Sequence, residues 1–289
     1  QRACCSGVRC ALSVGNRGRL PPAGLGAAMR SIEHAIAPPS VEGVVNPLLG
    51  FMRPDAQLAV IVVSDDQFDY RKLLTANDVK DERLRFVSTG RTGSGCHNAR
   101  NVGLAGSRGD FIAALDADDI HFPARLSVLI PLALANGAAS DNPVVVSGMG
   151  GAALYRAFDP TREHYRLDAA GLLDLSVPLF PVVAREHAES RLPGIELGED
   201  FVANLRLIDR LGGLTVIGET LSEYRVMIGS LAHNDSSADD FEKSYTGLID
   251  RLEGGDKLGL SAAAASIARD SLLRKREFNR AFAKARAAE

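Results

Sequence analysis

Two apolar runs that end in aspartates constrain the fold of this chain more than any other feature. The run LAVIVV at 58–63 ends in the pair Asp65-Asp66, and the run FIAAL at 111–115 ends in a loop with three aspartates, Asp116, Asp118 and Asp119. Continuous apolar runs of this length are typical of strands that are covered on both faces of a sheet. Because helical patterns separate the runs, the sequence predicts an α/β layered fold with a central, mainly parallel sheet.

The alternation of strand and helix patterns continues along most of the chain. Strands are predicted at 8–14, 58–63, 84–89, 111–115, 144–150 and 214–218. Helices are predicted at 23–36, 69–76 and 95–107, from about 124, from 199 to the glycine pair at 212–213, and over roughly the last 30 residues. The stretch at 219–234 has no clear period and predicts loops.

Charge and cysteine content narrow the class of protein. The 33 basic and 36 acidic residues give a net charge of -3, so a nucleic-acid partner is not expected. No apolar run approaches the roughly 20 residues that span a bilayer. The four cysteines, Cys4, Cys5, Cys10 and Cys96, are too few for a disulfide framework, and no histidine accompanies the first three. Reduced thiols in a cytoplasmic protein are the expectation.

The aspartate loop predicts a metal site. Ligands of open α/β sheets bind beyond the carboxyl ends of the strands. Alternate side chains of an extended chain point the same way, so Asp116 and Asp118 should converge and Asp119 should point elsewhere. Carboxylates suit Mg²⁺ or Mn²⁺, and one or two of them together with substrate phosphates form the usual magnesium site. A solvated turn is the alternative, because a short Asp-x-Asp triplet is common.

The stretch NARNVGLAGSRGDFIAALDADDIHFPARL at 98–126 resembles the signature of family 2 glycosyltransferases with the GT-A fold. The family pattern is an Ala-Arg-Asn-x-Gly helix, an Ala-x-Gly turn, a strand, then Leu-Asp-x-Asp-Asp and a proline. The matching positions here are 99–103, Gly106 with Gly109, 111–115, 116–119 and Pro123. The resemblance implies a Rossmann-like three-layer α/β/α fold of the GT-A type, with a central mainly parallel sheet and C-terminal helices.

Four further segments resemble landmarks of the same family in the same order. VIVVSDDQFD at 60–69 is similar to the motif that holds the nucleoside, with Gln67-Phe68 in place of Gly-Ser. LSVGNRGRL, GIELGEDFVANLRL and SEYRVMIGSLAH are similar to the first strand end, the Glu-Asp helix start and the closing segment. The resemblance covers about 12–235. It implies a glycosyltransferase domain at 1–235, with a nucleotide-binding half at about 1–125 and an acceptor half at about 126–235, and a helical extension at 236–289.

The resemblance also implies roles for residues at matching positions. A Mn²⁺ or Mg²⁺ ion would be bound by Asp118, Asp116 and His233. The nucleotide sugar would contact Asn16, Asp65, Asp66, Arg100 and Asp116. Asp200 would be the general base, with Glu199 beside it as the second catalytic candidate.

Structural roles are the alternatives at several of these positions. Asp65-Asp66 could cap a helix. The pair at 199–200 lies at a predicted helix start, where the helix dipole stabilises a carboxylate whatever its role. Arg100 could serve only to hold the loop against the sheet. His121 is expected on the surface rather than at a metal.

The implied activity is inverting, metal-assisted transfer of a sugar, hexosyltransferase-like, from a nucleotide-diphosphate sugar to a hydroxyl of a glycan, lipid-linked or small-molecule acceptor, as in polysaccharide biosynthesis. A catalytically silent nucleotide-sugar-binding protein and a nucleotidyl- or phosphotransferase with the same metal–diphosphate site are the alternatives. The basic segment RKREFNRAFAKAR at 274–286 is expected to be a solvated helix face, with at most a weak peripheral contact to the inner face of a membrane.

Overall fold

The computed structural model describes residues 8–15, 57–76, 78–148, 151–195, 197–226 and 237–286. The helix predicted at 23–36 lies outside these ranges. Two predicted site residues, Asn16 and His233, lie outside them as well.

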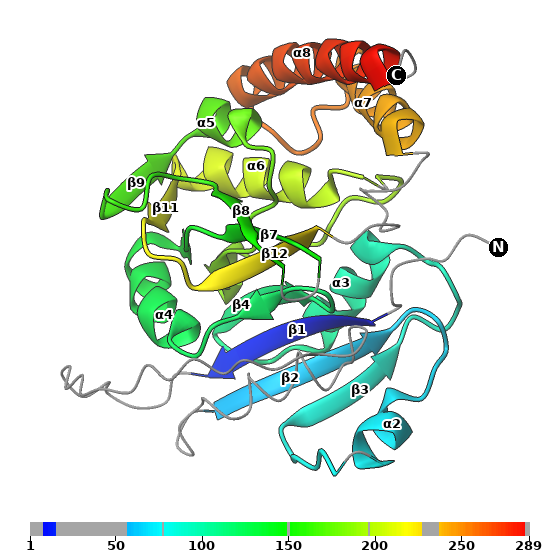
Figure 1. Cartoon of the computed structure of the whole chain (residues 1–289), viewed down its shortest axis with the longest axis vertical. Coiled ribbons are helices and arrows are strands. Elements are labelled where there is room, and N and C mark those ends of the chain that lie inside the picture. Colours follow the sequence, from blue (N-terminus) through cyan, green and yellow to red (C-terminus); the bar gives the residue numbers. More distant parts are fainter. Residues whose placement is uncertain are drawn as a thin grey trace.

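Eight strands form the main sheet (Figure 1). In spatial order they are β3 (Leu84–Ser88), β2 (Gln57–Ser64), β1 (Val8–Gly15), β4 (Phe111–Asp116), β10 (Val182–Ala184), β6 (Ala138–Ser140), β11 (Leu214–Ile217) and β9 (His164–Leu167). Helices lie on the sheet, as predicted for an α/β fold, and the predicted fold class is confirmed.

The prediction of mainly parallel pairing requires a correction. Within the described strands of this sheet, parallel pairing joins β2 to β3 and β6 to β11, and the other neighbours are antiparallel. Apolar patterns reveal that a strand is buried but not which way it runs. The short strands β9 and β10, which the sequence did not predict, account for three of the five antiparallel pairings.

The strands β2 and β4 nevertheless end at the same edge of the sheet. Both are antiparallel to β1, so they run in the same direction. Val8 pairs with Ser64 at the end of β2, and Arg9 pairs with Asp116 at the end of β4. The two acidic stretches that follow these strands therefore flank the same end of β1.

Helices cover β2 on both faces, which explains its continuous apolar run. Val62 belongs to a buried cluster with Leu74 and Leu129, whereas Val63 belongs to a second cluster with Ala99. The helices that supply these partners are α2 (Tyr70–Ala76), α4 (Arg125–Asn136) and α3 (Cys96–Gly106). The α/β/α layering that the sequence predicted is thus present around β2.

A second, four-stranded sheet lies beside the aspartate loop. Its strands, in spatial order, are β5 (Ile120–His121), β12 (Ser222–Val226), β7 (Val144–Ser147) and β8 (Ala153–Arg156). The sequence predicted loops where β12 lies, and β5 is too short to leave a pattern. This sheet matters for the site because β5 directly follows the aspartate loop and pairs with β12.

The second half of the chain has its own buried cluster, which includes Leu205, Leu214, Leu248 and Leu272. The helices involved are α5 (Ala169–Asp174), α6 (Glu199–Leu211), α7 (Ser237–Glu253) and α8 (Ala262–Arg286). Figure 1 shows α7 and α8 together at one end of the molecule. The C-terminal helices therefore share a core with the half that precedes them, and the domain boundary at 235 remains a prediction.

Candidate active site

Three carboxylates gather where β4 ends. One oxygen from each of Asp116, Asp118 and Asp119 lies within 4.8 Å of the others. The prediction that Asp119 points elsewhere is wrong, because strand alternation stops at Asp116. Residues 117–118 form a turn, in which the N–H of Asp119 donates to the carbonyl of Asp116 at 3.2 Å. The turn, rather than an extended chain, brings all three side chains together.

Strand β12 holds one side of this cluster. The backbone N–H of Arg225 donates to Oδ1 of Asp119 at 2.9 Å. Burial raises the pKa of the neighbouring Tyr224, and the charges of Asp119, Asp200, Asp116 and Asp118 raise it further. The charges of the three loop carboxylates and of Asp200 therefore act on the same phenol, that of Tyr224.

Arg100 links the cluster to the start of α6. Its Nη2 lies 2.6 Å from Oδ1 of Asp116, and its Nη1 contacts Oε1 of Glu199. The guanidinium also lies over the ring of Phe180, 5.2 Å from its centroid. Arg100 thus compensates part of the negative charge of Asp116 and joins two segments that are far apart in the sequence.

Glu199 is buried between two arginines. Its side chain is 2% exposed, and Nε of Arg191 lies 3.1 Å from its Oε2. Asn101 holds the backbone of Arg191 with two hydrogen bonds, of 3.0 and 2.6 Å. Burial and the adjacent Arg100 lower the pKa of Arg191 to about 10, so it stays cationic at neutral pH. Both Glu199 oxygens are ion-paired, and this geometry favours a structural role.

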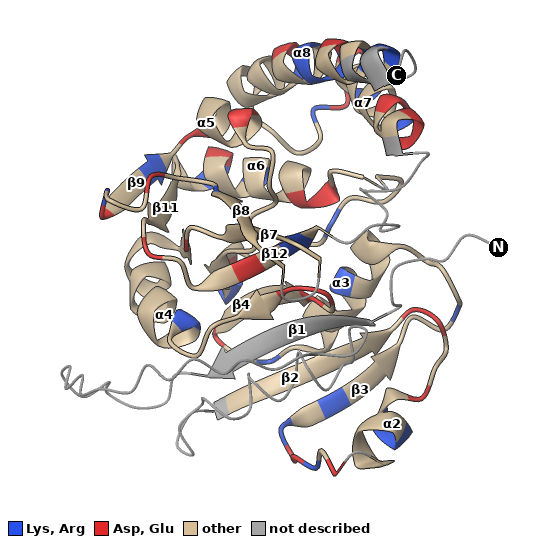
Figure 2. Cartoon of the chain, in the orientation of Figure 1, with Lys and Arg blue, Asp and Glu red and all other residues tan. Residues whose placement is uncertain are grey.

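Asp200 is more accessible than its neighbour. It is half-buried in the first turn of α6, which begins after Gly198 in the left-handed conformation. Its charge acts on both Arg191 and Tyr224. Figure 2 shows the start of α6 and the loop after β4 in red near the centre of the molecule. The structure therefore brings Asp200 to the same space as the aspartate cluster.

Asp65 orders the glycine-rich loop at 90–95. Its Oδ1 accepts hydrogen bonds from the Thr89 hydroxyl at 2.7 Å and from the Ser94 N–H at 3.0 Å. Its Oδ2 accepts from the N–H of Gly95 at 3.0 Å. The loop leads directly into α3, so Asp65 helps to place the helix that carries Arg100.

Asp66 is held at the other side of the same strand end. It accepts hydrogen bonds from the Tyr70 hydroxyl at 2.6 Å, the Ser64 hydroxyl at 2.9 Å and the Phe68 N–H at 3.0 Å. Burial alone would raise the pKa of Asp66, but these bonds together lower it. Asp66 is therefore a carboxylate at neutral pH.

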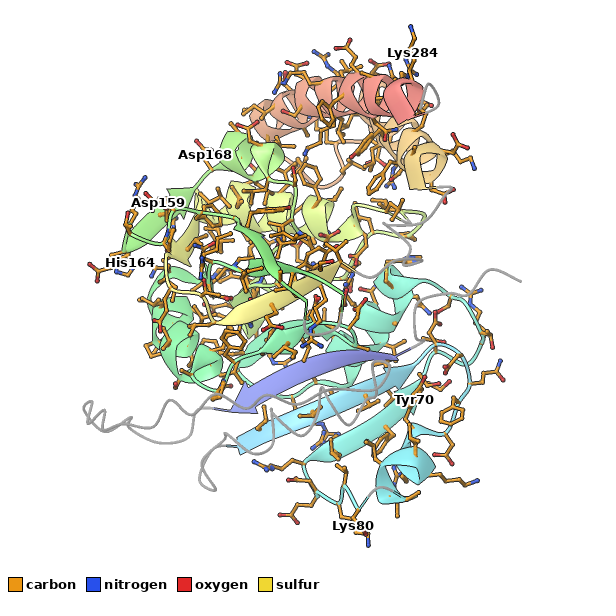
Figure 3. The ribbon with its side chains drawn as sticks, in the orientation of Figure 1. Tyr70, Lys80, Asp159, His164, Asp168 and Lys284 are labelled. Carbon is orange, nitrogen blue, oxygen red and sulfur yellow. The ribbon has the colours of Figure 1, made fainter. Side chains whose placement is uncertain are left out.

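A hollow of about 330 Å³ lies beside Asp66 at the ends of β2 and β3. Aromatic side chains and small polar groups line it, among them Ser64, Gln67, Phe68, Tyr70, Phe86 and Ser88. Phe68 is 53% exposed, and its ring meets the Tyr70 ring edge-on at 5.0 Å. Figure 3 shows Tyr70 at the β2–β3 end of the molecule, far from Lys284 on α8. An open aromatic surface of this kind can pack against a flat ring.

Gln67 occupies the glycine position of the family motif and keeps a glycine-like backbone. Its φ is 63°, a left-handed conformation that costs a residue with a Cβ about 1 kcal/mol. Gln67→Gly should remove this strain, although the freer unfolded chain offsets part of the gain. Gln67→Ala keeps the strain and loses the 3.2 Å hydrogen bond to the Thr92 hydroxyl. We expect Gln67→Gly to melt at or above the wild-type temperature and Gln67→Ala below it. Thermal unfolding checks this, and the reverse order would mean that the backbone here is unstrained.

Sequence patterns missed a buried polar network under the aspartate loop. Arg125 and Asp141 form an ion pair of 2.8 Å, and each side chain is 1% exposed. His121, which was expected on the surface, is buried beside Arg125. Burial and the Arg125 charge hold the pKa of His121 well below its ordinary value, so the ring is neutral. The only signal in the sequence was an arginine at the start of an otherwise apolar helix.

Comparison with known sequences agrees with the family that the motifs resemble. The family described as glycosyl transferase family 2 matches residues 38–178. The chain is also similar to the succinoglycan biosynthesis protein ExoO of Rhizobium meliloti (strain 1021), with 30% identity over 197 residues, or 60% of this chain and 49% of that protein. The chain therefore spans about half the length of this curated relative.

Solved structures show the same fold. TarS of S. aureus superposes with a TM-score of 0.60 at 13% identity, covering 81% of this chain and 66% of that chain. TarS in complex with UDP-GlcNAc gives a TM-score of 0.58 at 12% identity, covering 81% and 67%. GalNAc-T7 with UDP, GalNAc and Mn²⁺ gives 0.52 at 14% identity, covering 80% and 51%. These likenesses confirm the predicted GT-A type of fold.

Proposed function

We propose that this chain, whose residues 38–178 match glycosyl transferase family 2, transfers a sugar from a nucleotide-diphosphate sugar to an acceptor hydroxyl, with inversion at the anomeric carbon. The observation that carries the proposal is the convergence of the loop carboxylates at 116–119 with Asp200 around Tyr224. The loop carboxylates can thus hold a metal ion at the diphosphate of a donor. Asp200 can lie beside the hydroxyl of an acceptor.

The donor's nucleoside would lie at the ends of β2 and β3. The hollow lined by Phe68 and Tyr70 offers an aromatic surface, and Asp66 offers a carboxylate beside it. Asp65 would contribute through the glycine-rich loop that it orders, and Asn16 remains a predicted contact. TarS has been solved with UDP and with UDP-GlcNAc, so uridine nucleotides are the first donors to test.

The aspartate cluster suits a divalent cation. Carboxylate oxygens are hard ligands of the kind that Mn²⁺ and Mg²⁺ prefer, and three of them lie within 4.8 Å of one another. We assign the ion to Asp118 and Asp116, with Asp119 adjacent and His233 as a further predicted ligand. When bound, such an ion would offset the negative charge that develops on the leaving diphosphate.

The chain's own residues would carry the proton and the orientation. Asp200 would accept the proton of the acceptor hydroxyl as its oxygen forms a bond to the anomeric carbon. The bond from that carbon to the diphosphate oxygen breaks in the same step, and the nucleoside diphosphate leaves with the electron pair. Arg100 and Arg191 would hold the site's geometry through Asp116 and Glu199. A single displacement of this kind inverts the anomeric configuration.

Asp118→Asn tests the donor site. An amide is a poorer ligand for hard cations than a carboxylate. We expect Mn²⁺ to strengthen binding of UDP-GlcNAc or another nucleotide sugar to the wild type, and Asp118→Asn to lose most of that dependence. Calorimetric titrations with Mn²⁺ and with EDTA measure both effects. Equal affinity of the wild type in the two buffers would remove the metal from the mechanism.

The acceptor, the cellular location and any membrane contact remain predictions: a glycan, lipid-linked or small-molecule hydroxyl, and a cytoplasmic enzyme. Two basic side chains of α8 bind to other parts of the protein. Lys275 donates to the carbonyl of Leu175 at 3.0 Å, and Arg280 donates to Glu242. Both groups have partners within the protein, and the weak peripheral membrane contact stays a prediction. No helix in the described ranges combines the length and apolarity of a membrane span.

A further inference from the structure

We infer that the buried pair Arg125–Asp141 positions the donor site. The pair fixes the aspartate loop at 116–119 and also the Phe180 ring on which the Arg100 guanidinium lies. The inference rests on the proposed function, because it assumes that the loop at 116–119 binds a metal–diphosphate. Both side chains are buried, each 1% exposed. Each acts through other residues, along two routes that start from the same ion pair.

The first route runs from Asp141 to Asp119. One Asp141 oxygen, Oδ2, accepts hydrogen bonds from the N–H of Leu221 at 3.0 Å and from the hydroxyl of Ser222 at 2.6 Å. Leu221 directly precedes β12 and Ser222 begins it, and the N–H of Arg225 in the same strand holds the Asp119 carboxylate at 2.9 Å. Strand β12 also pairs with β5, the segment that immediately follows the loop. Asp141 therefore sets the strand that holds the far side of the cluster.

The second route runs from Arg125 to Asp116. Its Nε binds Asp141 at 2.8 Å, and its Nη2 donates to the carbonyl of Phe180 at 2.5 Å. The ring of Phe180 lies under the Arg100 guanidinium, which binds Asp116 at 2.6 Å. A single planar fork therefore fixes the Phe180 backbone and the Asp141 carboxylate at a defined separation.

The chemistry of the pair fits positioning better than stabilisation. A buried ion pair adds little net stability, because the cost of removing two charges from water offsets their attraction. Its hydrogen bonds are directional, however, and here they join segments at 121–125, 141, 180 and 221–222. Lysine keeps the charge of Arg125 but lacks the planar fork, so it cannot bind Asp141 and Phe180 with the same geometry.

Arg125→Lys tests the inference through affinity rather than stability alone. Loss of residues that orient metal ligands typically weakens metal binding about 10–100-fold. We expect a loss of that order in UDP affinity in the presence of Mn²⁺, measured by calorimetry well below the melting temperature, where circular dichroism shows the variant folded. The matched control is Leu272→Ala, which opens the C-terminal core at a residue 1% exposed. It should lower the melting temperature and leave UDP affinity unchanged.

Two results with these variants would overturn the inference. Wild-type affinity in Arg125→Lys would reduce the pair to a structural element. An equal loss in Leu272→Ala would attribute the effect to general destabilisation. If Arg125→Lys does not fold, Ser222→Ala, which removes one bond to Asp141, should weaken binding in the same direction, and unchanged binding would overturn the inference. A wild type that binds neither UDP nor any other nucleoside diphosphate in the presence of Mn²⁺ would instead refute the proposed function, and this inference with it.

Discussion

Asp200→Asn should keep the fold and the donor affinity of the wild type but lose sugar transfer by about 10²–10⁴-fold, the usual contribution of a general base. Asn has the size of Asp but cannot take up the acceptor's proton as a carboxylate does. The substitution also removes a negative charge from the first turn of α6, where the helix dipole favours it by about 0.3–1 kcal/mol. The melting temperature should therefore change little.

The measurement has two arms. Calorimetry with the nucleotide sugar and Mn²⁺ should give similar affinities for Asp200→Asn and the wild type, because the proposed donor contacts lie elsewhere. Product formation with a glycan or lipid-linked acceptor should fall by the factor above. Transfer at the wild-type rate would mean that Asp200 is not the base, and a parallel loss of donor affinity would place it in the donor site instead.

Glu199→Gln should strongly lower the stability of the fold, whereas Asp200→Asn should not. The substitution keeps the shape of the side chain but leaves Arg100 and Arg191 without their shared carboxylate in a buried site. Removing one partner of a buried ion pair costs about 3–5 kcal/mol, because the remaining charge is uncompensated. For a chain of this size, such a loss lowers the melting temperature by on the order of 10 °C.

Thermal unfolding of the two adjacent variants checks this prediction, and each serves as the control for the other. Both remove one negative charge from the first turn of α6, so the helix dipole affects them alike. A difference in melting temperature therefore reports the buried ion pairs of Glu199. If Glu199→Gln melts with the wild type and transfer is lost, Glu199 rather than Asp200 carries the proton.

Local patterns predicted the parts of the site that depend on neighbouring residues. The run at 58–63 is a strand buried on both faces, and the aspartate loop follows a strand as expected. The family motifs predicted that Arg100 and Asp200 belong to the site, and in the structure both lie near the aspartate cluster. One local prediction was wrong. Strand alternation predicted that Asp119 points away from Asp116 and Asp118, but the turn at 117–118 places it beside them.

Contacts between distant segments could not be read from the sequence. Strand direction in the main sheet depends on how segments pair, and apolar patterns carry no information about that. Asp141 meets Ser222 across 81 positions, and Asn101 meets Arg191 across 90. The burial of His121 and the pairing of Glu199 with two arginines follow from such contacts. Only the folded chain shows that these groups support the site.

The most direct test of sugar transfer is the release of nucleoside diphosphate from a panel of nucleotide sugars by the wild-type chain, with glycan and lipid-linked acceptors present. We predict release from at least one donor in Mn²⁺ or Mg²⁺, loss of that release in EDTA, and a loss of about 10²–10⁴-fold in Asp200→Asn. Nucleotide-sugar binding without release above buffer, for every donor and acceptor pair, would contradict an enzyme and favour a silent nucleotide-sugar-binding protein.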